Sequence, residues 1–509
     1  MEAAIKQTEH GLKGFSRIMG VLAVAVGTLL IAIDQFIVNV SVSTISGELG
    51  VSNNNGAWSI TAYTTASAVA IPLTGWLTAR IGRIRLLTLS AFLFAFTSFL
   101  CGTADTLGQL VFYRILQGIV GGPLIPLSQS LLLILIPNKG VAMGIFGMVV
   151  MVGPVIGPVL GGWITYDYGW RPIFYINVPI GIFVGIVVGT ILSHMESKKE
   201  KVPPDVIGIV LLFFSVGAYQ IVMNKGYDWA WFSDSRIRFL TIIAVICGTF
   251  LVAWEWFHER PAVNFRFFKD LDFTIALVIM TPVMAIVFCN LVIGPLWVQA
   301  NLGYDQLWAG FTLAPLGITA SIVFPIVGRL LTKIDVRIFV VISLVIMASA
   351  FYWMSCFTIT TDFRTMAYSR MLLGVGFAMC YPPMMLISIT NIAPAEMPSA
   401  AGVFSFARML GLGFGISYGT NYFYTRENFF QERYVSYIIP SNYAYAPYME
   451  ILKEKLGIVG QRADQFLYNM VFNQASTEVF LQTCYLSAIL LLSVLPLLLF
   501  VRPPKAAHQ

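Results

Sequence analysis

The sequence has little charge for its length. Of its 509 residues, 11% are Asp, Glu, Lys or Arg, whereas 57% are hydrophobic. Soluble globular proteins carry about 25% charged residues. A water-soluble fold of this length has no interior large enough to hold so much apolar surface. The scarcity of charge therefore excludes an ordinary soluble protein and predicts that lipid surrounds much of the chain.

Residues that could build an enzyme site are also scarce. The four histidines lie in the termini or at the ends of apolar segments, and no two of the six cysteines have CxxC spacing. A metal site or an intramembrane acid–base centre would need such residues to cluster. The GxxxxGK[ST] loop that ATP-driven transport requires is also missing. We therefore expect that the chain is not an enzyme, has no catalytic residue and binds no metal or other cofactor.

Long apolar runs are what the sequence has instead. A spanning helix needs about 20 mostly apolar residues, and fourteen segments meet this requirement. We expect helices because only helices and closed barrels satisfy every backbone group in lipid, and a barrel would show shorter, alternating segments. The expected segments are 18–40, 57–79, 86–104, 107–136, 141–163, 173–192, 206–223, 239–257, 273–298, 308–331, 336–357, 366–389, 400–424 and 478–501.

Lysine and arginine are distributed unevenly among the loops. Most lie in the N-terminal segment and in alternate loops after it, for example Arg80, Arg83 and Lys139. Loops rich in these residues face the cytoplasm. Both termini are therefore predicted to be cytoplasmic, although the loop 224–238 fits this pattern poorly. The net charge of +6 reflects this topology rather than a nucleic-acid partner.

The two halves of the chain carry related stretches. The stretch 75–83 lies at the end of the second segment, and the stretch 328–333 lies at the end of the tenth. Two segments later, each half has an arginine inside an apolar segment, Arg114 in the first half and Arg370 in the second. Such internal repeats are common in secondary transporters. The sequence thus predicts an all-α polytopic membrane protein with two six-helix halves and two inserted helices. The expected parts are 1–192 (first half), 193–272 (inserted pair and its loops) and 273–509 (second half, with an outside loop at 425–477).

The fifth segment carries a regular series of glycines. Three of them recur every four residues and form one stripe on a helix, which lets another helix approach closely. A proline beside the stripe weakens the backbone hydrogen bonds and favours a bend. Ordinary GxxxG packing would explain the stripe alone. The complete pattern resembles the antiporter signature of the major facilitator superfamily, which marks exporters that exchange substrate for protons. Its residues are Gly144, Gly153, Gly157, Pro158, Gly161 and Gly162.

The resemblance to this superfamily extends along nearly the whole chain. Asp34 lies in the stretch 33–40, which resembles the first-helix motif of the fourteen-span drug:proton antiporters, and the stretches 170–181 and 408–411 are similar to the same group. The EmrB/QacA-type multidrug exporters match best. Two features depart from the pattern. Ala79 stands where the superfamily motif usually has Asp, so the usual charge contact is missing, and segments ten and thirteen lack the mid-helix carboxylate of some exporters of cationic drugs.

Asp34 and Arg114 are the candidates for proton coupling. A charged group inside a span costs roughly 2.5–3.5 kcal/mol on insertion scales, which favours a function for Asp34. A carboxyl group that is exposed to each side of the membrane in turn can load and release a proton. The alternative is a hydrated carboxylate near the outer helix end. Arg114 cannot discard its charge. It either modulates Asp34 or is a structural arginine bonded to facing helices.

Two further groups of residues are candidates for substrate binding and gating. Inward-facing aromatic, methionine and polar side chains could line an apolar cavity, and Arg408 could attract acidic substrates there. The cavity candidates are Tyr63, Gln117, Met148, Met151, Tyr381 and Arg408. A tight cytoplasmic turn follows the second segment, and the resemblance implies that it links the gates, although topology alone would also place positive charges there. This turn contains Gly75, Arg80, Gly82 and Arg83.

The resemblance implies a proton-coupled antiporter of the bacterial cytoplasmic (inner) membrane. We expect it to export hydrophobic, neutral or weakly acidic small molecules, a function typical of multidrug efflux and antibiotic resistance. Export of a specific endogenous metabolite or siderophore, and proton symport, are the alternatives. The outside loop 425–477 contains two helix candidates, 447–455 and 461–473. EmrB-type exporters work with a periplasmic adaptor and an outer-membrane channel, so the loop is either a docking site for such an adaptor or a self-contained lid.

Overall fold

The computed structural model describes residues 14–501 except 198–202, 204, 260, 332, 394–395, 439–441, 443–444 and 457–459. The described residues form helices and contain no strand. The first part comprises α2 (Phe15–Ile37), α3 (Val42–Glu48), α4 (Asn53–Gly56), α5 (Trp58–Ala70), α6 (Thr74–Ile81), α7 (Arg83–Gly102), α8 (Leu107–Gly121), α9 (Leu124–Leu135), α10 (Lys139–Tyr168), α11 (Pro172–Tyr175) and α12 (Asn177–Ile191).

The remaining helices follow the same pattern of long elements and short connections. They are α13 (Val206–Lys225), α14 (Ser235–Phe257), α15 (Leu271–Leu302), α16 (Gln306–Phe311), α17 (Ala314–Leu330), α18 (Val336–Met354), α19 (Phe363–Ile389), α20 (Met397–Val435), α21 (Tyr445–Leu456) and α22 (Gln461–Ser493). Short 3-10 turns are η1 (Val38–Ser41), η2 (Ser193–Met195), η3 (Trp231–Ser233), η4 (Phe265–Lys269) and η5 (Leu495–Phe500).

Thirteen helical spans of the described chain are long and apolar enough to cross a membrane. The remaining expected segment, 57–79, is the second in the chain and is formed by two shorter helices, α5 and α6. They are separated by a turn at Pro72, which has no backbone N–H and clashes with the preceding helical turn. The second crossing is therefore a broken helix, and the expectation of a polytopic all-α protein is confirmed.

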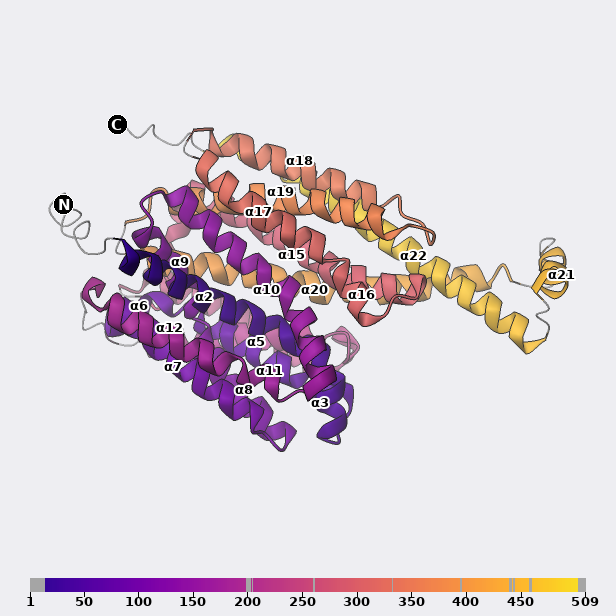
Figure 1. Cartoon of the computed structure of the whole chain (residues 1–509), viewed down its shortest axis with the longest axis horizontal. Helices are drawn as coiled ribbons and strands as arrows, with labels where there is room; N and C mark the ends of the chain where they lie inside the picture. Colours follow the sequence, from indigo (N-terminus) through magenta and orange to yellow (C-terminus); the bar gives the residue numbers. More distant parts are fainter. Residues whose placement is uncertain are drawn as a thin grey trace.

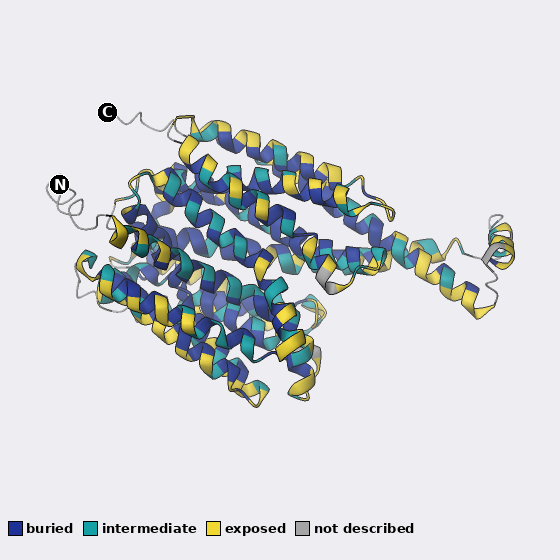
Figure 2. Cartoon of the chain, viewed as in Figure 1, coloured by how far each residue is buried: buried dark blue, intermediate teal, exposed yellow. Residues whose placement is uncertain are grey.

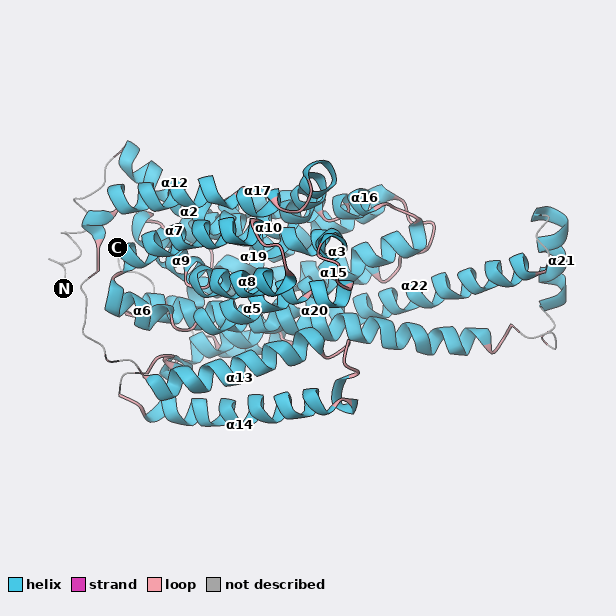
Figure 3. Ribbon diagram, turned by 90° about the horizontal axis from the view of Figure 1, so that it is seen from below, coloured by secondary structure: helices cyan, strands magenta, loops and turns pink. Residues whose placement is uncertain are grey.

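Two groups of helices lie side by side along the long axis (Figure 1). The group α2–α12 meets the group α15–α22 where α10 packs against α17 and where α20 packs against α6 and α9. The pair α13 and α14 lies outside these groups (Figure 3), and α13 contacts both α5 and α20. We name the end of the bundle where α2 begins the terminal end, and the opposite end the arm end.

Exposed residues lie along the outside of the bundle (Figure 2), and many of them are large and apolar. Phe213 and Phe250 on the inserted pair are more than half exposed, as are Ile322 on α17 and Leu490 on α22. A water-soluble surface seldom presents so many large apolar side chains together. On helices of spanning length this surface fits contact with lipid.

The region expected as an outside loop is mostly helical and extends beyond the bundle. Helix α20 has 39 residues, roughly 58 Å at the usual rise, whereas the hydrocarbon core is about 30 Å thick. The helix continues past the expected end at 424, and α22 begins at Gln461 rather than at 478. Together with α21, these extensions form a projecting arm, residues 425–477 (Figures 1 and 3).

Two local features hold the arm together. The helix candidates at 447–455 and 461–473 correspond to α21 and to the first turns of α22. Leu452, Ala463 and Leu467 are buried and form a small apolar cluster between these two helices. The arm therefore has a core of its own, separate from the core of the bundle.

Candidate coupling site

Asp34 lies in the last turn of α2 and is fully buried. The chain continues beyond it through η1 and α3, so the end of α2 is covered rather than open. This burial argues against the alternative of a hydrated carboxylate at the helix end. A buried carboxylate is costly unless other groups supply hydrogen bonds and opposite charge.

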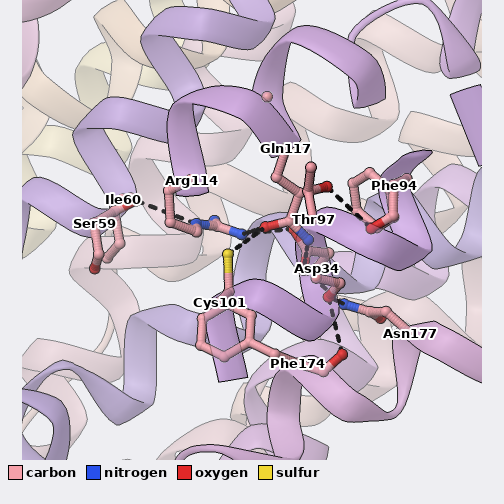
Figure 4. A network of polar contacts seen from close by, with 12 residues as sticks. Asp34, Ser59, Ile60, Phe94, Thr97, Cys101, Arg114, Gln117, Phe174 and Asn177 are labelled. Atoms are coloured by element: carbon pink, nitrogen blue, oxygen red, sulfur yellow. Dashed lines mark hydrogen bonds and ion pairs between the residues drawn. The ribbon is translucent and has the colours of Figure 1, made fainter. Parts of the chain in front are cut away.

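Three side chains from two other helices satisfy the carboxylate of Asp34 (Figure 4). Arg114 Nη1 lies 2.8 Å from Asp34 Oδ2 in an ion pair. Gln117 donates from Nε2 to Asp34 Oδ1 at 3.2 Å, and Asn177 donates from Nδ2 to the same oxygen at 2.7 Å. Arg114 and Gln117 both lie on α8, about one helical turn apart, so they face Asp34 from the same side of that helix. Asn177 is the first residue of α12.

The guanidinium of Arg114 has partners beyond Asp34. Its Nε donates to the carbonyl of Ser59 at 3.2 Å, and Nη1 also donates to Gln117 Oε1 at 2.7 Å. The ring of Tyr63 lies 4.0 Å from the guanidinium carbon, a cation–π distance. The Nη2 of Arg114 has no hydrogen-bond partner among the described residues. Arg114 thus has both a structural role and direct contact with the carboxylate.

A second layer of polar groups fixes the amides that face Asp34. Asn177 Nδ2 also donates to Ser98 Oγ at 3.0 Å, and Ser98 donates to the carbonyl of Phe174 at 2.9 Å. Cys101 donates to Gln117 Oε1 at 3.5 Å. The sequence interpretation missed Asn177, although it lies in the recognised stretch 170–181. Its signal was an amide within an apolar segment, where few neutral polar side chains occur.

The glycine stripe of α10 packs against the part of α2 that carries Asp34. A Cβ atom at Gly153 would lie 2.5 Å from the carbonyl oxygen of Ala32, and one at Gly161 would lie 2.5 Å from that of Ile37. At Gly157 the nearest atom, Phe36 Cβ, would be 3.1 Å away. The stripe therefore brings the α10 backbone next to the helix of the coupling site.

The other glycines of the antiporter pattern have different surroundings. Gly144 faces the opposite group of helices, where a Cβ atom would lie 2.6 Å from the carbonyl oxygen of Phe324 on α17. Gly162 has open space around it. Pro158 lies inside α10, beside the stripe. Only three of the five glycines thus form the α2 contact.

The turn between α6 and α7 is held by the chain that follows α12. Gly82 has a φ of 100°, which L side chains rarely adopt. Glu196 accepts hydrogen bonds from the backbone N–H groups of Ile84 and Arg85, and the N–H of Arg83 donates to Ser197 Oγ. Glu196 thus brings a carboxylate to the turn in which Ala79 replaces the usual acid.

The other candidates in this turn lie on α6. Gly75 meets α20 of the opposite group, where a Cβ atom would lie 2.8 Å from Ser399 Cα. The guanidinium of Arg80 stacks on Trp76. Gly75 therefore belongs to the contact between the two helix groups, and Arg80 stays within its own group.

A small void of about 20 Å³ lies between the two groups, beside the coupling site. Tyr63 and Arg408 line it together with Gln35. Arg408 is 7% exposed and forms no hydrogen bond with any described residue; its buried Nε has no partner. A buried guanidinium nitrogen without an acceptor is unfavourable, so this nitrogen is free to donate to a group from outside the chain.

The other four cavity candidates do not line this void. Gln117 points to Asp34 instead, because its amide bonds both the carboxylate and Arg114. Tyr381 is buried among aromatic rings, including Phe146 of the opposite group at 6.4 Å. Met148 and Met151 lie on α10 outside the lining of the void. Their roles in a substrate cavity stay predictions, because the sequence does not fix the rotation of a helix that is apolar on all sides.

The chain is similar to known proteins over most of its length. The family model of the Major Facilitator Superfamily matches residues 24–416. Multidrug export protein EmrB of Escherichia coli (strain K12) is 35% identical over 98% of both chains. Fatty acid resistance protein FarB of Neisseria gonorrhoeae is 34% identical over 97% of both chains.

Solved structures show the same fold at low sequence identity. The human organic anion transporter MFSD10 has a TM-score of 0.59 and 12% identity, covering 94% of this chain and all of its own. The proton:xylose symporter XylE has a TM-score of 0.53 and 15% identity over 96% of both chains. The expected major facilitator fold and the resemblance to EmrB-type exporters are thus confirmed. The chain belongs to the Major Facilitator Superfamily, as a multi-span membrane transporter and not an enzyme.

Proposed function

We propose that the protein is a proton-coupled exporter and that Asp34 carries the proton. The observation that carries this proposal is the fully buried pair of Asp34 and Arg114, joined at 2.8 Å between two spanning helices. Three donors face the carboxylate and hydrogen-bond both of its oxygens. Protonation of Asp34 would remove the ion pair and weaken the hydrogen bonds that hold α2 to α8 and α12.

The glycine stripe offers a physical link between protonation and movement. Gly153, Gly157 and Gly161 let α10 slide on α2 without side chains in the way. On its other face, α10 packs against α17 of the second helix group, and Gly144 lies at that contact. A shift of α2 after protonation therefore reaches the interface between the two groups through one helix, α10.

The described conformation holds the two groups together at the terminal end. Gly140 and Gly328 meet backbone to backbone, Gly75 meets Ser399, and Gln129 donates to Met385 Sδ at 2.8 Å. The central void is correspondingly small, about 20 Å³. In an alternating-access cycle these contacts open, the void enlarges, and substrate enters next to Arg408.

The charge distribution supports one choice of substrate class. Three buried arginines, Arg114, Arg370 and Arg408, lie in the two helix groups, where Asp34 pairs with Arg114 and no described carboxylate pairs with the other two. Such an interior favours hydrophobic neutral or weakly acidic compounds over cations. The name of FarB, which refers to fatty acid resistance, fits the same class. Export of one endogenous metabolite or siderophore, and proton symport, stay as alternatives.

The placement of the protein follows from the loop charges. We propose that the terminal end faces the cytoplasm of a bacterium and that the chain lies in the cytoplasmic (inner) membrane. The termini themselves, residues 1–13 and 502–509, lie outside the described residues. In this orientation the arm projects on the periplasmic side in a Gram-negative host.

The arm then offers a surface to a periplasmic adaptor, and through it to an outer-membrane channel. Tyr437, Tyr468 and Met470 are exposed on it, and exposed aromatic residues and methionine are enriched at interfaces. Three other tyrosines of the arm, Tyr434, Tyr445 and Tyr448, instead pack against neighbouring apolar side chains. Tyr443 lies outside the described residues. A lid that only covers the cavity is the alternative.

The test of proton coupling uses purified protein in sealed liposomes with an imposed pH gradient. Asp34→Asn should abolish proton-driven substrate accumulation, because an amide cannot release a proton, while substrate binding persists. Asp205→Asn is the matched control, since Asp205 is a buried carboxylate at the start of α13, away from the coupling site. Full proton-driven accumulation by Asp34→Asn, with normal protein yield, would refute the proposal.

A further inference from the structure

The second helix group contains a polar pair that mirrors the coupling site. Arg370 of α19 is buried, and its Nη1 donates to Asn290 Oδ1 of α15. Asn290 in turn donates from Nδ2 to Cys484 Sγ of α22 at 3.5 Å. No Asp or Glu of the described chain pairs with Arg370. The pair therefore combines an arginine with a neutral amide.

Sequence spacing and helix position identify this pair as a copy of the first. Asp34 and Arg114 are 80 residues apart, and Asn290 and Arg370 are also 80 residues apart. In each group the first residue lies on the opening long helix, α2 or α15, and the arginine lies on the fourth crossing, α8 or α19. Two repeats that diverged by substitution would keep this spacing.

A glycine stripe accompanies the pair in both groups. Gly411, Gly415 and Gly419 of α20 recur every four residues and approach Thr281, Ala285 and Cys289 of α15. This contact between α20 and α15 corresponds to the contact between α10 and α2. The second group thus repeats both the polar pair and the close helix contact beside it.

The two copies differ in the group that can carry a proton. Asp34 faces Arg114, Gln117 and Asn177, whereas Asn290 faces Arg370 and Cys484. A carboxamide has the same shape as a carboxylate but does not ionise. The exchange of Asp for Asn therefore removes the titratable group and leaves the architecture in place.

We propose that Asn290 and Arg370 form a proton-silent copy of the coupling site, and that the amide at position 290 limits the transporter to one proton per cycle. This inference rests on the proposed function of Asp34. It makes Asn290 a stoichiometry-determining residue. A carboxylate at position 290 would lie beside Arg370, as Asp34 lies beside Arg114, and would add a second proton to each cycle.

The experiment measures the proton-to-substrate ratio of the purified protein in liposomes with the membrane potential held at zero. The pH gradient that just balances a substrate gradient gives the ratio. If each cycle couples one more proton, the substrate concentration ratio that a difference of one pH unit can balance becomes about tenfold larger. We expect this increase for Asn290→Asp relative to wild type, and an unchanged ratio for Asn301→Asp. Asn301 lies on the same helix and bonds Trp297 and Ser476 rather than an arginine.

Further variants separate this inference from the proposed function. Asn290→Ser should keep the wild-type ratio, since the pair takes no part in proton transfer; a loss of coupling in that variant would overturn the inference. If Asn290→Asp does not fold, Cys484→Asp replaces it in the same measurement, because position 484 on α22 places a carboxylate beside the amide of Asn290. An active carboxylate variant with the wild-type ratio would also overturn it. Proton coupling that survives Asp34→Asn refutes the proposed function instead.

Discussion

At the scale of single residues, the geometry of the guanidinium decides what can replace Arg114. Its Nη1 reaches both Asp34 and Gln117, while Nε reaches the carbonyl of Ser59. A lysine presents one ammonium group on a flexible stem and cannot reproduce these fixed directions. The charge at position 114 alone is therefore insufficient to hold α8 to α2 and α5.

Arg114→Lys should consequently reduce transport although it preserves the charge. We expect the initial rate of proton-driven transport to fall by about tenfold or more, as for the loss of at least one charged hydrogen bond. The rate is measured in everted membrane vesicles and normalised to the amount of protein. Arg364→Lys, at an exposed position near the start of α19, is the control. A rate within twofold of wild type would show that charge alone suffices.

The sequence predicted some residues of this site but not all of them. Asp34 and Arg114 could be singled out because charged side chains are rare and costly inside apolar spans. Asn177 and Asn290 are neutral, and an amide in an apolar segment is less unusual, so neither was singled out. The contact between Asp34 and Asn177 joins residues 143 positions apart. Such a contact depends on how the helices pack, which a single sequence does not specify.

At the scale of helices, the glycines of α10 differ in how much space surrounds them. The backbone of α2 leaves no room for a Cβ atom at Gly153, whereas Gly162 on the same helix has open space. Alanine has similar helix-forming tendency at both positions and is better than glycine. The two substitutions therefore differ mainly in whether they push α2 away.

Gly153→Ala should impair transport, and Gly162→Ala should not. The added methyl group at position 153 meets the carbonyl oxygen of Ala32, and overpacking of this kind costs about 1–3 kcal/mol. We expect a lower transition temperature and a slower transport rate for Gly153→Ala alone. Thermal unfolding in detergent and transport in liposomes measure the two effects. Equal behaviour of the two variants would show that the stripe has room to spare.

Helix ends were harder to anticipate than helix cores. The expected spans relied on hydropathy, which falls where a helix leaves the lipid even though the helix continues. Helix α20 accordingly runs on to Val435, although the apolar pattern stops near residue 424. The opposite error occurs at Pro72, where one apolar segment contains two helices. Hydropathy reports contact with lipid, whereas backbone hydrogen bonding and proline decide where a helix ends.

At the scale of the whole molecule, the contact of Gly75 with Ser399 reports whether the terminal end is closed. These residues come from α6 and α20, one in each helix group. Paired cysteines at Gly75 and Ser399 should form a disulfide under mild oxidation and stop transport, and reduction should restore it. The reduced double variant is the control, because a cysteine at position 75 by itself brings a Cβ atom within 2.6 Å of Ser399 Cβ. Unchanged transport by the fully cross-linked protein would show that these helices do not separate during the cycle.

The projecting arm allows the proposed adaptor contact to be tested separately from transport. Its apolar cluster lies between α21 and α22, outside the bundle, so its removal should leave the core of the bundle intact. Replacement of residues 436–460 by a short glycine–serine linker should retain transport in liposomes. The same variant should lose cellular resistance and co-purification of the adaptor, because the docking surface is gone. Tyr437→Ala is the milder variant, since Tyr437 is 59% exposed. Loss of transport in liposomes by a well-folded arm variant would instead support the lid, because no adaptor is present there.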